Sequence, residues 1–271
     1  MSDESIKSVL NEQRRFAPND AFAKNARVKS REDYERLYRE SLDDPESFWR
    51  RETSELVFRK TWTVTSSTKD GAKPASFPHV RWFEDAELNI TESCLDRHLT
   101  GPRRNKAALL WEGEMGGTRT VTYAELHRET VRLANALAAH GVQKGDRVAI
   151  YMGMVPEVVV AMLACARLGA VHTVVFGGFA ADALRDRIAD CQAKLVITQD
   201  GGYRRGQVLA LKEVVDRAVA QPEAKSVEKV IVYRHLGERG PQIHMKEGRD
   251  LWWHEIVDES TKGPAKEATV V

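Results

Sequence analysis

Cysteine is scarce in this 271-residue sequence, and so are long hydrophobic runs. The three cysteines, Cys94, Cys165 and Cys191, are odd in number and widely spaced, which excludes a zinc or disulfide framework and favours a reducing, cytoplasmic setting. The longest apolar run, from Val158 to Ala166, is too short to span a bilayer. The N-terminal residues lack the apolar core of a secretory signal, so the sequence predicts neither an exported nor a membrane-spanning protein.

Neither basic nor acidic residues are in clear excess. Lys plus Arg number 41 and Asp plus Glu number 40, so the formal net charge of +1 removes the main argument for nucleic acid or an anionic membrane as a partner. The eight histidines form no H-x-x-x-H or H-E-x-x-H pair, and no Walker, G-x-S-x-G or G-x-G-x-x-G pattern occurs. Cys165 and Cys191 fall in helical patterns typical of core thiols. We therefore expect no catalytic residue and no metal ligand in this chain.

The composition that remains is that of a globular protein, with 42% hydrophobic and 30% charged residues. We expect a polar tail at residues 1–32, a helical and loop-rich lobe at 33–100 and an α/β region at 101–271. In the lobe, Tyr34 and Tyr38 lie at helical spacing, Pro45 marks a helix start, and residues 65–80 have the composition of a loop. Four aromatic residues are interpreted as anchors for the lobe: Trp49, Trp62, Trp82 and Phe83.

Strands alternate with helices from residue 107 onward. A T-x-x-E capping box at Thr122 and Glu125 begins one helix, which Gly141 ends, and Pro156 begins another, which ends near Gly169. Further helices are expected at 182–191 and 211–220, and strands at 107–111, 147–152, 171–176, 195–198 and 229–232. This order predicts an α/β fold with a mostly parallel, doubly wound sheet, in which 147–152, 171–176 and 195–198 are neighbouring buried strands.

Two glycine-containing turns follow strands of the predicted sheet. One carries Phe176, Gly177 and Gly178, and the other has the sequence DGGYRRGQ at 200–207. Ligands bind outside the carboxyl ends of parallel strands, glycines let a ligand approach the backbone, and arginine suits phosphate. The alternatives are a tight strand-to-helix turn without a ligand and a flexible loop of solvated arginines. The residues by themselves suggest a small phosphate-bearing ligand and no reaction.

The longest motif carries a resemblance to a known family. The run from Gly145 to Asp190, GDRVAIYMGMVPEVVVAMLACARLGAVHTVVFGGFAADALRDRIAD, resembles the AMP-forming acetyl-coenzyme A synthetases, and so do DPESFWRR, CLDRHL, TVTYAELHRETVRLANAL and LVITQDGGYRRGQ in the same order. The resemblance runs from about residue 33 to the end. It implies that 33–100 is the family's N-terminal extension and that 101–271 is the first part of its adenylate-forming domain, of the firefly-luciferase type.

The resemblance also implies an activity and a ligand. The family converts acetate and Mg-ATP to acetyl-AMP and then transfers the acetyl group to coenzyme A (CoA). The matching residues imply that Phe176, Gly177 and Gly178 lie against the adenine of CoA. A basic turn would hold its 3′-phosphate, and it comprises Arg204, Arg205, Gly206 and Gln207. The family usually has a basic residue where Gln207 stands, and the sequence also departs from the family pattern at Ala86, Ser93 and Gly153.

The family's phosphate loop, acetate pocket, magnesium site and catalytic lysine are expected beyond Val271. We therefore expect the 271 residues to be the N-terminal part of an acetate–CoA ligase and to be inactive alone. Three alternatives stay open: a non-catalytic protein that binds CoA or a partner, a ligase for propionate or another short acid, and, more distantly, a nicotinamide-dependent dehydrogenase.

Overall fold

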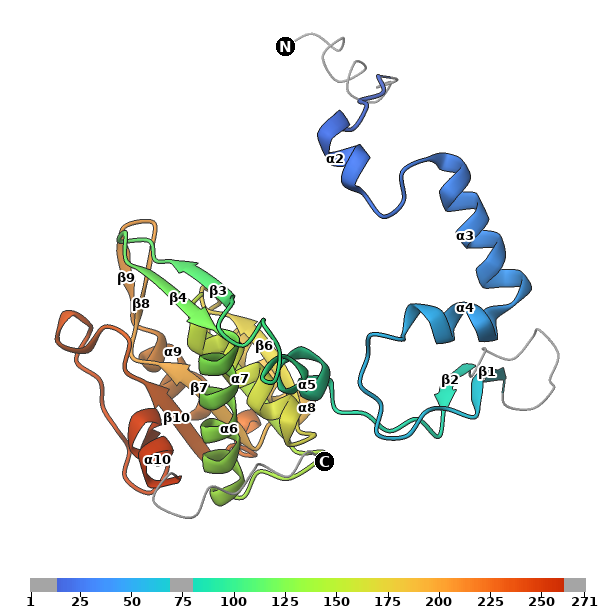
Figure 1. Cartoon of the computed structure of the whole chain (residues 1–271). Coiled ribbons are helices and arrows are strands. Elements are labelled where there is room, and N and C mark those ends of the chain that lie inside the picture. The colour runs from blue at the N-terminus through green and yellow to red at the C-terminus, as the bar shows by residue number, and fades with distance from the viewer. Residues whose placement is uncertain (1–13, 69–79, 261–271) are drawn as a thin grey trace, which may run out of the picture. The chain divides into compact units, whose positions relative to one another are not determined.

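The computed structural model describes residues 14–68 and 80–260. The chain divides into two compact units: unit 1 comprises Met1–Ser54 and Trp62–Asp85, and unit 2 comprises Glu55–Thr61 and Ala86–Val271. Figure 1 shows the elements of both.

The described residues of unit 1 form three helices and a two-stranded antiparallel sheet. The elements are α2 (Asp20–Asn25), α3 (Arg31–Asp43), α4 (Pro45–Glu52), β1 (Val64–Thr68) and β2 (Val80–Glu84). The side chains of Asn19, Ser30 and Asp44 accept hydrogen bonds from the first turns of the three helices, which explains where each begins. The helices predicted around Tyr34 and after Pro45 are confirmed.

The structure adds to one prediction for this part of the chain and corrects another. Within the predicted polar tail it places α2, which Asn19 caps and in which no residue is buried. The loop expected at 65–80 begins as strand β1, because Ser66 and Ser67 pair with Trp82 and Arg81. Residues 1–13 of the tail and 69–79 of the loop lie outside the described residues.

The aromatic residues of unit 1 pack on one another. The ring centroid of Trp49 lies 5.7 Å from that of Trp82 and 6.0 Å from that of Phe83, and Trp62 lies 4.8 Å from Phe83. Trp62 is buried, and its indole N–H donates to the hydroxyl of Thr65. These edge-to-face contacts give the small unit an apolar centre of its own.

The central sheet of unit 2 is parallel, as predicted. Its strands follow the order β11-β10-β7-β5-β6. Their bounds are β5 (Arg147–Met152), β6 (Val171–Phe176), β7 (Leu195–Gln199), β10 (Lys229–Tyr233) and β11 (Asp250–Trp252). The expected pairing of the first three is confirmed, with β5 between β6 and β7.

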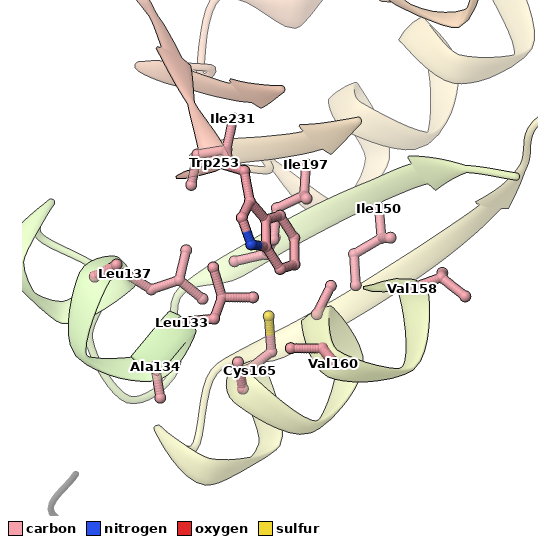
Figure 2. Close-up of a cluster of buried hydrophobic side chains, with 14 of the residues drawn as sticks. Leu133, Ala134, Leu137, Ile150, Val158, Val160, Cys165, Ile197, Ile231 and Trp253 are labelled. Carbon is pink, nitrogen blue, oxygen red and sulfur yellow. The ribbon is translucent and has the colours of Figure 1, made fainter. Parts of the chain in front are cut away.

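Helices cover both faces of this sheet. One core cluster joins the sheet to α6 (Tyr123–Ala139), α7 (Pro156–Arg167) and α10 (Trp253–Ser260), and the other joins it to α8 (Ala181–Cys191) and α9 (Leu211–Val219). Successive residues of β5 point to opposite faces, so Ile150 belongs to the first cluster and Tyr151 to the second. Figure 2 shows the first cluster, where burial raises the pKa of the Cys165 thiol to about 12. The prediction of Cys165 as a core thiol is confirmed.

One strand is less buried than predicted. In the described part of the chain β6 is the edge strand of the sheet and pairs with β5 alone. Val171 and Val174 are therefore 56% and 48% exposed, whereas all side chains of β7, an inner strand, are buried. An apolar strand sequence does not distinguish an edge position from a central one.

Two antiparallel hairpins lie outside the parallel sheet. The run predicted at 107–111 is β3 (Ala107–Glu112), which pairs with β4 (Thr118–Thr122). The capping box of Thr122 and Glu125 follows directly and begins α6, as predicted. The turn predicted as flexible at 200–207 contains a second hairpin, made of β8 (Gly202–Arg204) and β9 (Gln207–Leu209).

Candidate functional site

A pocket of about 570 Å³ opens at the carboxyl ends of the parallel strands of unit 2. It is lined by residues that end or follow four of these strands: Met152 to Val155 at β5, Phe176 to Gly178 at β6, Gln199 and Gly202 to Arg204 at β7, and His235 and Leu236 after β10. The end of β3 and the turn after it form a further wall with Trp111, Glu112 and Glu114. Ligands of open α/β sheets bind at this edge, and the volume falls in the range of small-molecule sites.

The turn after β6 is held by close packing within the protein. A Cβ on Gly177 would lie 2.9 Å from the carbonyl oxygen of Met152, and one on Gly178 would lie 1.8 Å from Nη1 of Arg204. Gly177 is therefore needed by the backbone of β5, whereas the atom nearest to Gly178 is the end of a side chain. The Phe176 ring remains 49% exposed at the pocket wall.

The hairpin after β7 carries the basic residues that the sequence singled out. Arg205 and Gly206 form its two-residue turn with φ values of +51° and +74°, the arrangement of a type I′ turn. The guanidinium carbon of Arg204 lies 4.6 Å from the centroid of the Phe176 ring, a cation–π contact. The structure thus brings Arg204 together with the glycine turn.

The remaining predicted residues lie elsewhere. Arg205, Gly206 and Gln207 are exposed at the tip of the hairpin, outside the wall that the described residues form around the pocket. The backbone N–H of Gly206 donates a 2.5 Å hydrogen bond to Oε1 of Glu114.

Several residues of the pocket were not singled out by the sequence. Trp111 Nε1 donates to the carbonyl oxygen of Met154 at 2.7 Å, which ties β3 to the loop after β5. Gln199 accepts from the N–H of Gly153 at 3.1 Å and donates to the carbonyl of Gly201 at 2.7 Å. No local motif marks these residues, although Gln199 stands at a strand end, where such residues can be sought.

Asp200 fixes the wall of the pocket that follows β10. Its buried carboxylate accepts backbone N–H groups of Gly201, His235, Leu236 and Gly237 at 2.7 to 3.1 Å. All acceptor positions are used inside the protein, so Asp200 orders the loop at 235–237 and is not exposed to a ligand.

The electrostatics of this wall are set by burial and by arginine. Burial lowers the pKa of His235, whose ring lies 6.3 Å from Trp111, so the imidazole is neutral at neutral pH. Burial together with the adjacent Glu157 raises the pKa of Tyr233, so its hydroxyl stays protonated. The positive groups on the pocket wall are Arg204 and Arg239. The site therefore offers aromatic faces and guanidinium groups, which suit a flat ring that bears an anion.

The described residues lack two further features, a metal-binding cluster and a membrane-spanning helix. Within 14–68 and 80–260, no group of three or more His, Cys, Asp and Glu side chains is arranged to hold a metal ion. None of the helices in the same ranges is long and apolar enough to cross a membrane.

Nearly the whole chain matches two protein-family models. Residues 34–94 match the family model described as acetyl-coenzyme A synthetase N-terminus, and residues 95–270 match the model described as AMP-binding enzyme.

Similar proteins agree with this. The chain is 48% identical over 269 residues to the acetyl-coenzyme A synthetase of Streptomyces avermitilis (99% of this chain, 39% of that protein). It is 45% identical over 256 residues to that of Chlorobaculum tepidum (94% and 37%). It thus spans less than two fifths of the relatives' length. The solved structure of the acetoacetyl-CoA synthetase from Streptomyces lividans aligns with a TM-score of 0.73 and 28% identity, over 89% of this chain and 37% of that one. The chain therefore belongs to the family of AMP-binding enzymes, and within it resembles the N-terminal portion of the acetyl-coenzyme A synthetases.

Proposed function

We propose that this chain is the N-terminal part of an acetate–CoA ligase. The complete enzyme would convert acetate, ATP and CoA to acetyl-CoA, AMP and pyrophosphate through acetyl-AMP. The contribution of this chain is to bind the nucleotide end of CoA in the pocket at the strand ends. This proposal rests on the contact between Phe176 and Arg204 at that pocket. The guanidinium carbon of Arg204 lies 4.6 Å from the centroid of the Phe176 ring, and the two residues belong to different strands. Cytoplasmic localisation is part of the same proposal.

The residues have distinct parts in CoA binding. The half-exposed ring of Phe176 offers a face to the adenine, and the turn of Gly177 and Gly178 brings that ring to the pocket. Arg204 supplies a guanidinium fork for the 3′-phosphate. Arg205, Gly206 and Gln207 form the tip of the same hairpin and belong to the proposed phosphate site.

We also propose the division of the chain into a tail at 1–32, an N-terminal extension at 33–100 and the first part of the AMP-binding domain at 101–271. The change of matching family between residues 94 and 95 supports a boundary near residue 100.

Calorimetric titration of the 271-residue chain tests the site. CoA and dephospho-CoA differ only in the 3′-phosphate, so wild type should bind CoA more tightly. A charge-assisted contact contributes about 1.5–3 kcal/mol, so Arg204→Ala should weaken CoA binding about tenfold to a hundredfold and leave dephospho-CoA nearly unchanged.

Arg187→Ala is the matched control. Arg187 also lies over an aromatic ring, that of Phe179, at 5.0 Å, but it is not among the residues lining the pocket. Its loss should change neither affinity by more than about twofold. Equal losses for both ligands in Arg204→Ala would show that Arg204 maintains the fold of the site. Failure of wild type to bind CoA would refute the proposed site.

A further inference from the structure

The basic hairpin already holds a carboxylate in the structure. Oε1 of Glu114 lies 2.5 Å from the backbone nitrogen of Gly206, although 92 residues separate the two in sequence. Glu114 belongs to the turn between β3 and β4, and Gly206 to the turn between β8 and β9. Figure 1 shows the two hairpins at the same end of unit 2.

Both sides of this contact are held in place. The β3–β4 turn is closed by hydrogen bonds from Gly113 N to Gly117 O at 2.7 Å and from Gly116 N to Gly113 O at 2.8 Å. Next to this turn, the Trp111 indole N–H donates to the carbonyl oxygen of Met154 and ties β3 to the loop after β5. On the other side, the positive φ values of Arg205 and Gly206 fix the direction of the Gly206 N–H. The contact is therefore made by two constrained turns.

The position of this carboxylate matters because of what surrounds it. Arg204 and Arg205 precede Gly206 directly, so a negative group at the Gly206 N–H lies in the positive field of the hairpin. An anion that uses Arg204 and the hairpin backbone would meet the same N–H. Glu114 and a ligand phosphate would repel each other if both were present, since both are negative and near one donor.

We propose that Glu114 is a built-in competitor for the phosphate-binding hairpin, and that a phosphate-bearing ligand must displace its carboxylate from Gly206. This inference rests on the proposed function, because it concerns the same site. A phosphate dianion carries more charge than a carboxylate and replaces it at the hairpin, whereas a ligand without the phosphate leaves Glu114 in place. Glu114 thereby lowers the affinity for CoA and leaves that for dephospho-CoA unaffected.

Titration of the 271-residue chain with CoA and dephospho-CoA tests the proposal in three variants. Glu114→Gln removes the charge, and Glu114→Asp keeps it on a side chain one methylene shorter. Glu213→Gln is the control: Glu213 is an exposed carboxylate on α9 that is not among the residues lining the pocket, and its loss changes the net charge by the same amount. We expect Glu114→Gln to bind CoA about three to ten times more tightly than wild type, and Glu114→Asp to show a smaller gain. Dephospho-CoA should bind all proteins equally, and Glu213→Gln should change CoA affinity less than twofold.

Each other outcome overturns the proposal. If Glu114→Gln binds CoA no more tightly than wild type while Arg204→Ala still weakens CoA, the phosphate site stands and the competitor does not. If Glu213→Gln and Glu114→Gln raise the affinity for CoA equally, the effect is one of overall charge. If Glu114→Gln raises the affinity for dephospho-CoA as much as the affinity for CoA, Glu114 acts on another part of the ligand. If no protein binds CoA, the proposed function fails and this inference fails with it.

Discussion

The guanidinium of Arg167 holds the carboxylate of Asp96 at two points, Nη1 to Oδ2 at 2.8 Å and Nη2 to Oδ1 at 3.0 Å. Arg167 is only 4% exposed and stands in the last turn of α7, whereas Asp96 follows α5 (Ile90–Cys94). The Asn89 side chain donates to the carbonyls of Ala166 and Arg167 at 3.1 Å in both cases. The segment at 89–98 is thereby fixed to the carboxyl end of α7.

We expect Asp96→Asn to lower the free energy of unfolding by about 3 kcal/mol, because it leaves the buried guanidinium of Arg167 without its countercharge. Urea denaturation followed by far-ultraviolet circular dichroism measures the change. The control is Glu213→Gln, which removes the exposed pair of Glu213 with Arg217 and should cost less than about 1 kcal/mol. Equal effects of the two substitutions would show that the Asp96 pair contributes no more than a surface pair.

The same pair predicts a loss of stability in acid. Burial raises the pKa of Asp96, but hydrogen bonds from His127 and Arg167 and the charge of Arg167 outweigh burial and hold that pKa below its usual range. A depressed pKa stabilises the fold above the unfolded-state value of about 4, and this contribution is lost as the pH falls toward the folded-state value.

Urea denaturation at a series of pH values between 6 and 3 measures this dependence. Wild type should lose stability steadily below about pH 5, and Asp96→Asn should lose less over the same interval because it has no carboxyl group to protonate at position 96. Parallel curves for the two proteins would contradict the assignment of this acid sensitivity to Asp96.

Asp200 gives a prediction for the pocket wall. Asp200→Asn places an NH₂ group among backbone N–H donors that all need an acceptor, so we expect a loss of about 1–3 kcal/mol in unfolding free energy. Amide hydrogen exchange should accelerate at residues 235–237. Asp182→Asn, at an exposed side chain paired with Arg185, is the control and should leave this exchange unchanged. Protected amides at 235–237 in Asp200→Asn would contradict the assigned role.

The fold could be predicted where the sequence pattern is longer than a few residues. The inner strands β5, β7 and β10 are mainly apolar runs in the sequence. Helix α6 begins at the predicted capping box, and both hydrogen bonds of that box are present in the structure. β8 and β9 were missed because three-residue strands leave no measurable alternation. The exposure of β6 was missed because strand order is set by tertiary pairing, which a local pattern does not encode.

The site was predictable in part for a similar reason. Phe176 ends β6, and Arg204 lies in the segment that follows β7, so the parallel order of β6 and β7 brings both to one edge of the sheet. Their stacking depends on side-chain packing, and the contact of Glu114 with Gly206 depends on two hairpins that the local sequence does not relate to each other. The assignment of CoA came from the family resemblance, because a glycine turn and adjacent arginines are common in loops that bind nothing.

Gly177 and Gly178, which follow β6, should respond differently to substitution, because backbone atoms lie next to the first and side-chain atoms next to the second. A methyl group on Gly177 would meet the backbone oxygen of Met152 at 2.9 Å, which the sheet holds in place, so Gly177→Ala should cost about 1–3 kcal/mol of unfolding free energy. The three atoms nearest to a methyl group on Gly178 all belong to side chains: two at the end of Arg204, which can rotate away, and Cε1 of Phe176 at 3.0 Å. Gly178→Ala should therefore leave stability within about 0.5 kcal/mol of wild type but move Arg204 off the Phe176 ring. Urea denaturation measures the first effect, and the side-chain resonances of Arg204, shifted by the ring current of Phe176, report the second. Equal destabilisation by the two substitutions would show that Arg204 is as rigidly held as the backbone of β5.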